Sequence, residues 1–176
     1  MPNKKEQTRR FRYAAGYVIQ QEGTGVVERL VRDGTMTRFG VREDQFLSSS
    51  LEELNRTDAE KILRKKEWRF QNYDKIKISA VTVPAKIFDT QILFSAERAI
   101  SLAQKALQDL QFKSVEESGR LDPITRDRIA KATPKNFFEN YITRLELFVQ
   151  DEYGQPILRR IRNLPYKNVE TSTTTI

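Results

Sequence analysis

The sequence contains neither cysteine nor histidine. Without cysteine the chain forms no disulfide scaffold, and without either residue it lacks the ligands of Cys/His zinc sites. Nucleophilic catalysis of the Ser-His-Asp and Cys-His kinds is excluded, and so is histidine acid–base chemistry. A hydrolase built from this chain must therefore use carboxylates, hydroxyls, lysine or a metal bound through oxygen.

Long apolar runs are also missing. The apolar segment nearest the basic N-terminus covers only residues 14–19, runs into charge and glycine, and lacks the features of a signal peptide. No stretch approaches the roughly 18 apolar residues of a membrane span. We therefore expect a protein that is made in the cytoplasm without a signal peptide and that leaves it only by another route.

The composition that is present suits one folded domain, or one domain with a small appendage. The 176 residues are 38% hydrophobic and 10% aromatic, which is typical of a globular protein. A net charge of +7 favours anionic partners such as nucleic acid, anionic lipid or the acidic polymers of a bacterial envelope. Basic clusters at residues 4–12 and 159–162 are more often solvated surface than binding patches.

Apolar spacing and helix caps predict a mostly helical chain. Phe11, Ala14, Ala15 and Val18 follow a helical repeat, which predicts a helix over residues 6–22 that ends at Gly23. Thr57 with Glu60 forms a capping box that predicts a helix at 57–70, and Asp122-Pro123 and Thr133-Pro134 predict helices over 123–132 and 134–151. Apolar spacing predicts further helices after Pro84, from near Ser95, and over 156–163.

One small hairpin is expected near the N-terminus. Residues 26–41 are rich in β-branched side chains and are divided by Asp33-Gly34, which suits a two-residue turn. That turn would set Val31 opposite Met36, but it would also set Arg29 opposite Arg38, so the register is left open. The predicted fold class is α+β, mainly α.

Glu22 is the first candidate for chemistry. It lies eleven positions after Phe11, and at about 100° a residue it returns to within roughly 20° of the apolar face. A helix C-terminus and an apolar flank both disfavour a charged carboxyl group, which suits the general acid of glycoside hydrolysis. Asp33 and Thr37 follow on the hairpin. Each residue could instead have a purely structural role: Glu22 at a helix end, Asp33 in a turn and Thr37 in a strand.

The order of several motifs resembles a known family. Glu22-Gly23 followed by GTMTRFGV at 34–41 is similar to the signature of the lysozyme-like muramidases of glycoside hydrolase family 108, found among phage endolysins and secretion muramidases. Similar segments follow in the family's order: TDAEKILRKKEW at 57–68, IFD at 87–89, LAQKAL at 102–107 and GRLDPIT at 119–125. The resemblance covers residues 11–164.

The resemblance implies a lysozyme-like helical fold with one small hairpin. It implies a catalytic part at 1–96 and a helical part at 97–164, which is similar to a peptidoglycan-binding half and packs with the first part as one unit. The sequence of the remaining residues, 165–176, predicts a disordered tail. It further implies that Glu22 is the general acid and that Thr37 and Asp33 position water or stabilise the oxocarbenium-like state. Substrate contacts would come from Arg38, Phe39, Trp68 and Asp89, and no metal or cofactor would be needed.

The departures from the family pattern lie around the expected cleft. Arg160-Ile161 stands where the family has Gly-Trp, and the loop after Glu22 is one residue longer, so Asp33 matches only with a shift. The other departures are Thr24, Thr35 and residues 93–95. Glu22 itself is kept.

Three hypotheses follow. The first is a peptidoglycan hydrolase, an N-acetylmuramidase, that acts at the cell wall or in the periplasm after holin-dependent export or as part of a phage particle. The second is a catalytically silent virion or secretion-apparatus component of the same fold that binds the wall or a protein. The third is a nucleic-acid binder, supported by charge and by RRIR at 159–162 but by no helix-turn-helix or RNP-like motif. We therefore expect bacterial peptidoglycan as the partner and no nucleic acid.

Overall fold

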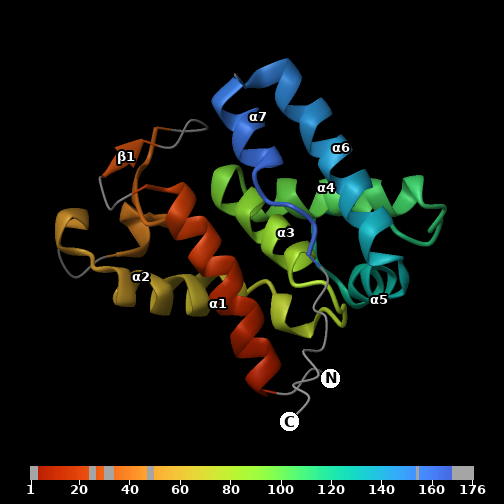
Figure 1. Ribbon diagram of the computed structural model, residues 1–176, viewed down its shortest axis with the longest axis horizontal. Helices are drawn as coiled ribbons and strands as arrows, with labels where there is room; N and C mark the ends of the chain where they lie inside the picture. Colours follow the sequence, from red (N-terminus) through yellow and green to blue (C-terminus); the bar gives the residue numbers. More distant parts are fainter. Residues whose placement is uncertain (1–3, 24–26, 30–33, 47–49, 154, 168–176) are drawn as a thin grey trace, which may run out of the picture.

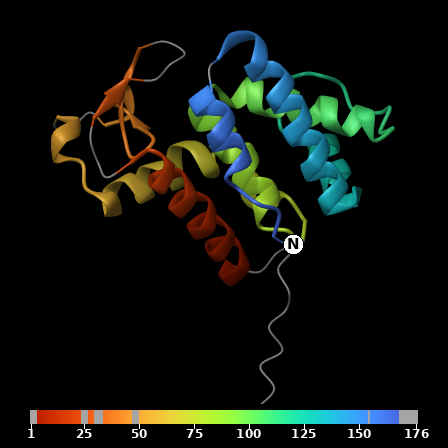
Figure 2. The same cartoon turned by 45° about the horizontal axis from the view of Figure 1, so that its top comes forward.

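The fold is organised around a central helix, α3 (Thr82–Leu93), in which every residue is buried. The computed structural model describes residues 4–23, 27–29, 34–46, 50–153 and 155–167. Figures 1 and 2 both show α1 (Lys4–Gln21) on one side of α3, with α4 (Ala96–Asp109) and α6 (Pro134–Glu152) on the other. All three pack against α3. The residues before and after position 96 therefore share one core.

The remaining helices follow the predicted order. They are α2 (Arg56–Ile62), a π-helical segment at Leu63–Trp68, α5 (Pro123–Lys131) and α7 (Gln155–Arg162). Short 3₁₀ turns lie at Glu43–Gln45, Leu51–Glu53 and Tyr73–Lys75. Asp122 caps α5 as predicted, and Ser95 caps α4 at the predicted start of that helix. Thr133 precedes α6 as predicted, but its side chain makes no capping hydrogen bond. The cap of α2 was predicted wrongly as Thr57, because the Asn55 side chain accepts the Asp58 N–H at 2.9 Å and starts the helix earlier.

A three-stranded antiparallel sheet in the order β1-β2-β3 replaces the simple hairpin. Its strands are β1 (Glu28–Arg29), β2 (Met36–Arg38) and β3 (Val41–Arg42). Arg29 pairs with Met36, so the register differs by two residues from the predicted pairing of Val31 with Met36. A shift of two keeps each residue on its predicted face. Asp33, predicted to form the turn, lies outside the described residues.

Phe39 and Gly40 form a second hairpin turn that the sequence did not predict. Arg38 pairs with Val41, which leaves two residues to connect β2 and β3. Both have positive φ, 55° and 77°, as a type I′ turn requires. A Cβ on Gly40 would lie 2.8 Å from Val18 Cγ1 and 3.6 Å from Glu22 Cγ, so only glycine lets this turn close onto the end of α1.

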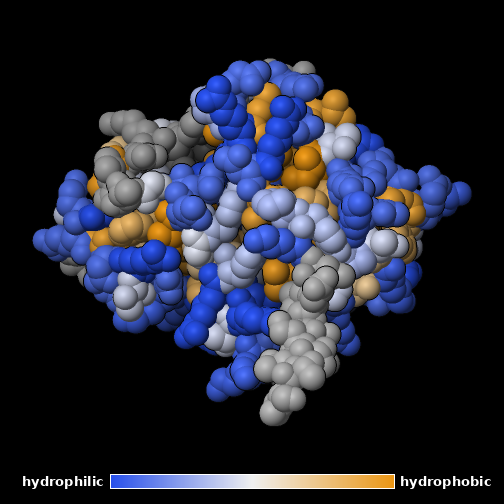
Figure 3. All heavy atoms as spheres, in the orientation of Figure 1, coloured by the Kyte–Doolittle hydropathy of each residue, from blue (hydrophilic) through white to orange (hydrophobic). Residues whose placement is uncertain are grey.

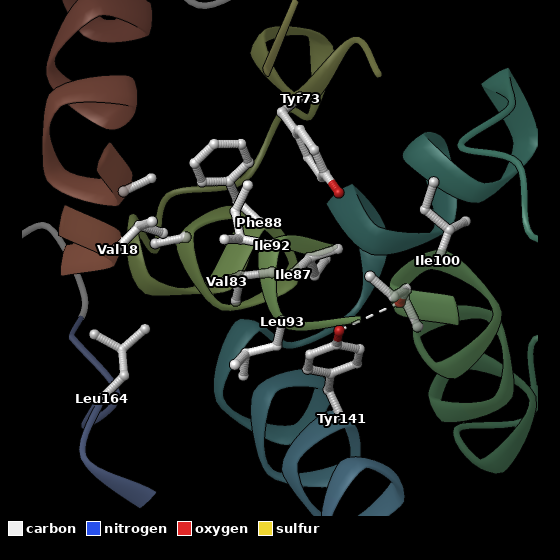
Figure 4. Close-up of a cluster of buried hydrophobic side chains, with 14 of the residues drawn as sticks. Val18, Tyr73, Val83, Ile87, Phe88, Ile92, Leu93, Ile100, Tyr141 and Leu164 are labelled. Carbon is white, nitrogen blue, oxygen red and sulfur yellow. Dashed lines mark hydrogen bonds between the residues drawn. The ribbon is translucent and has the colours of Figure 1, made fainter. Parts of the chain in front are cut away.

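The core contains a compact aromatic group. The rings of Phe11, Trp68, Tyr73 and Phe88 lie with centroids between 5.2 and 5.9 Å apart. On the other side of α3, the hydroxyl of Tyr141 donates to the carbonyl of Ala99 at 3.3 Å (Figure 4). Hydrophilic side chains cover most of the face in Figure 3, with hydrophobic ones in narrow groups between them.

Candidate active site

Glu22 lies immediately after α1 and is almost fully buried. Its backbone N–H donates to the Val18 carbonyl at 2.9 Å, which continues the helical turn by one residue. The residue is only 6% exposed, between the end of α1 and the Phe39–Gly40 turn. A carboxyl group at such a depth needs polar partners, because burying an unpaired charge is costly.

Arg160 of α7 is one partner of Glu22. Its Nη1 donates to Glu22 Oε1 at 2.5 Å. Its Nε and Nη2 donate to Asp89 Oδ1 at 3.1 and 2.7 Å, and Asp89 Oδ2 accepts from Lys86 Nζ at 3.3 Å. Glu22, Arg160, Asp89 and Lys86 thus form a chain of alternating charges, called here the four-charge network.

The backbone of Arg160 is held as firmly as its side chain. The Arg160 carbonyl accepts the hydroxyl of Tyr17 at 2.9 Å and Lys86 Nζ at 3.3 Å. Lys86 Nζ also lies 5.7 Å from the centroid of the Tyr17 ring. Helices α1, α3 and α7 therefore meet at this one arginine, which fixes the direction of its guanidinium group.

Burial and charge act against each other in the network. Burial lowers the pKa of Lys86, and the Asp89 charge only partly offsets it. Burial would raise the pKa of Asp89, but Arg160 and Lys86 outweigh it and hold that pKa below its usual value. Burial would lower the pKa of Arg160, yet Asp89 and Glu22 raise it. An adjacent guanidinium favours an ionised carboxyl, so Arg160 opposes the protonated Glu22 expected from the helix end alone.

Thr37 is on the same hairpin as the turn that covers Glu22. Its side chain is 2% exposed, and its hydroxyl donates to the Val41 carbonyl at 3.1 Å. A hydroxyl that donates once keeps lone pairs that can accept. Asp33, the third predicted catalytic residue, lies outside the described residues.

The four predicted substrate contacts separate into two groups. Trp68 and Asp89 are 1% and 0% exposed, and their side chains are used in the aromatic core and the four-charge network, so neither can touch a polymer at the surface. Arg38 donates to the carbonyl of Leu51 at 3.0 Å and also to that of Glu52, and its Cζ lies 5.3 Å from the Phe39 ring centroid. Phe39 is partly exposed and is the one best placed for contact.

Sequence reasoning missed two residues of interest, Arg160 and Glu67. Arg160 was noted only because it stands where the family pattern has glycine. Glu67 lies in the π-helical segment, where Gln45 and Gln91 donate to its carboxylate. Burial raises the pKa of Glu67 despite these hydrogen bonds. No local motif marks either residue, because their partners come from distant segments.

A groove of about 670 Å³ runs along α1 and the segment after α7. Arg12, Tyr13, Tyr17, Gln20, Gln21 and Lys167 contribute to its lining, which has two cations and, among the described residues, no carboxylate. Within the described part of the chain no group of three or more acidic residues could hold a metal ion. None of the described helices is long and apolar enough to cross a membrane.

Comparison with known proteins gives a structural likeness only. No protein-family model matches the chain, and neither does any curated protein. Among solved structures, SagA of Brucella abortus is similar, with a TM-score of 0.69 and 18% identity over 89% of this chain and 92% of that one. At this identity the likeness concerns the fold, which is mainly α and lysozyme-like.

Proposed function

We propose that the protein is an N-acetylmuramidase that cleaves the β-1,4 bond between N-acetylmuramic acid and N-acetylglucosamine, with Glu22 as general acid. The observation that carries this proposal is a buried carboxyl at the end of α1, closed in by a hairpin turn, in a lysozyme-like fold. The resemblance of residues 22–23 and 34–41 to the signature of glycoside hydrolase family 108 gives the same residue the same role.

In this proposal Glu22 gives its proton to the glycosidic oxygen as the bond to the sugar carbon breaks. The sugar ring then carries oxocarbenium-like positive charge. Water adds to the ring carbon and releases a proton, and Glu22 takes up a proton again for the next cycle. Thr37, whose oxygen can still accept, and Asp33 would orient that water. Phe39 would offer an apolar surface to a sugar ring beside the turn, and Arg12 and Lys167 in the groove suit an anionic polymer.

The test compares Glu22→Gln with a matched glutamate variant. Glu67→Gln serves as the control, since it also removes a largely buried carboxyl that accepts side-chain hydrogen bonds. Purified proteins would be mixed with a peptidoglycan suspension, followed by turbidity and by mass spectrometry of released fragments. We expect Glu22→Gln to lose at least about 100-fold in rate, and Glu67→Gln to keep the wild-type rate.

Equal clearing by wild type and Glu22→Gln would contradict the general-acid role. A loss confined to Glu67→Gln would move the acid to the π-helical segment. Fragments lighter by one water than the hydrolysis products would show cleavage without attack by water.

A second candidate is a catalytically silent protein of this fold that binds the cell wall or a protein partner. The pairing of Glu22 with Arg160 favours it, because a guanidinium group favours the ionised form of a carboxyl, and that form cannot donate a proton. Co-sedimentation with insoluble peptidoglycan by both wild type and Glu22→Gln, without fragment release by either at any pH, would support this candidate over the muramidase.

A further inference from the structure

We propose that Arg160 is a positioning residue that fixes the Glu22 carboxyl in one orientation and makes it harder to protonate than it would be without the arginine. The inference deepens the proposed muramidase function and rests on it. It also makes a claim about Glu22 itself that can be measured without any substrate.

The orientation follows from the number of contacts that hold Arg160. Its guanidinium donates twice to Asp89 Oδ1, which leaves Nη1 directed at Glu22 Oε1 at 2.5 Å. Its carbonyl accepts from Tyr17 and Lys86. The Arg160 side chain is 12% exposed, so it is not free to swing into solvent without breaking these contacts. Glu22 therefore meets a fixed donor, not a mobile surface cation.

The effect on protonation has a definite sign. A cation beside a carboxyl stabilises the carboxylate, so more acidic conditions are needed to protonate it. A general acid works only while it holds its proton, so its activity falls as pH rises through its titration. Arg160 therefore moves the descending limb of the activity profile toward lower pH.

Among the described residues, the groups around Glu22 come from α7, α3, α1 and the β2–β3 turn. Helix α7 brings Arg160, and α3 brings Asp89 and Lys86 behind it. Helix α1 contributes Tyr17, whose pKa burial raises well above the working range, so it stays neutral. The β2–β3 turn brings Phe39 and Gly40, which do not titrate.

Asp89 acts on Glu22 through the same arginine but with the opposite sign. Its carboxylate lies 2.7 Å from Arg160 Nη2 and partly neutralises the guanidinium. Asp89→Asn would remove that negative charge and leave more of the Arg160 charge to act on Glu22. The two variants Arg160→Gln and Asp89→Asn should therefore move the profile in opposite directions, which simple loss of stability would not do.

The experiment measures fragment release from peptidoglycan between pH 4 and 8 for wild type, Arg160→Gln, Arg160→Lys and Asp89→Asn. Arg162→Gln is the matched control, because Arg162 is on the same helix and pairs with Glu146 at the surface. The descending limb is the pH range over which activity is lost as pH rises. We expect it to move by about 1 pH unit or more toward higher pH in Arg160→Gln, to move toward lower pH in Asp89→Asn, and to stay in place in Arg162→Gln. Arg160→Lys keeps the charge and should shift the limb less than Arg160→Gln.

A second measurement needs no substrate. The carbon-13 shift of the Glu22 carboxyl, followed by NMR against pH, should show Glu22 losing its proton at lower pH in wild type than in Arg160→Gln, while the titration of Glu67 is the same in both. A Glu22 titration that does not move, or an unmoved limb in a folded Arg160→Gln, would overturn the inference. If instead Glu22→Gln clears peptidoglycan like wild type, the proposed function fails, while the NMR comparison still decides the Arg160–Glu22 coupling.

Discussion

Two buried polar networks lie in the same core, one charged and one neutral. The four-charge network joins α1, α3 and α7 through ion pairs of 2.5 to 3.3 Å. The neutral network centres on Gln104 of α4, which is fully buried. Its amide nitrogen donates to Ser118 Oγ, the Arg120 carbonyl and Thr125 Oγ1, and its oxygen accepts the N–H groups of Ser118 and Gly119.

The two networks differ in what they contribute: the neutral one contributes to stability, and the charged one acts on the proposed catalytic residue. Gln104 holds the loop before α5 through uncharged hydrogen bonds. Both its amide nitrogen and its amide oxygen have partners, as a buried amide requires. Four buried charges pay a desolvation penalty that apolar side chains of similar volume would avoid. The charged network is therefore better explained by its action on Glu22 than by its contribution to folding.

The sharpest test of this contrast is Asp89→Ala. The change leaves Arg160 and Lys86 buried without their shared carboxylate, so we expect a loss of about 3–5 kcal/mol in unfolding free energy. Urea denaturation followed by fluorescence of Trp68, the only tryptophan, would measure it. A loss below about 1 kcal/mol would mean that the charges are not desolvated as the burial implies.

Gln104→Leu should cost less. The Gln104 oxygen accepts two backbone N–H groups, of which that of the exposed Ser118 can turn to water and that of the buried Gly119 cannot. We therefore expect a loss of about 1–3 kcal/mol in unfolding free energy. The same denaturation assay applies. Peptidoglycan cleavage by the folded fraction should be unchanged, since Gln104 touches no member of the four-charge network. If Gln104→Leu lost activity while staying folded, the neutral network would also contribute to function, and the distinction between the two networks would be wrong.

Each network has a neighbouring glycine with positive φ, which allows a matched pair of smaller changes. A Cβ at Gly40 would meet Val18 at 2.8 Å, and one at Gly119 would meet the Glu97 side chain at 2.5 Å. We expect Gly40→Ala and Gly119→Ala each to lose about 1–2 kcal/mol, with activity reduced only by Gly40→Ala, whose turn covers Glu22. Gly16→Ala, in open space within α1, is the control and should be neutral or mildly stabilising.

The last expected effect is the dependence of stability on pH through Asp89, which should be negligible above about pH 4. Because the folded-state pKa of Asp89 is lowered, its contribution is present above the unfolded pKa near 3.9 and is lost as pH falls through the folded value. Wild type should therefore lose its stability advantage over Asp89→Asn only below about pH 4. Gln104→Leu should show the same pH dependence as wild type, since no titrating group was changed. Denaturation midpoints at a series of pH values would measure both.

The sequence predicted the helices well because their signals are local. Ser95 and Asp122 bond within three residues of themselves, so caps at these positions need no tertiary information. The Phe39–Gly40 turn escaped prediction because it closes against Val18 and Glu22 at the end of α1.

Within the candidate site, helical spacing correctly indicated that Glu22 is turned inward. It could not show that an arginine would meet it there. RRIR has three arginines on one short helix, and only packing against α1 and α3 decides that Arg160 is the buried one. Trp68 and Asp89 were predicted as substrate contacts, and the sequence could not show that both are buried, since a matched motif does not reveal depth.

The separation of Glu22 and Arg160 along the chain affects when the site is completed during synthesis and folding. The two residues are 138 positions apart, so Glu22 leaves the ribosome long before the helix that carries its partner. Until α7 is synthesised and docked, the carboxyl cannot adopt its final environment, and the chain forms local helices before such distant contacts. The site is therefore completed among the last steps of folding, and a product that stopped before α7 would carry the glutamate without the arginine that orients it.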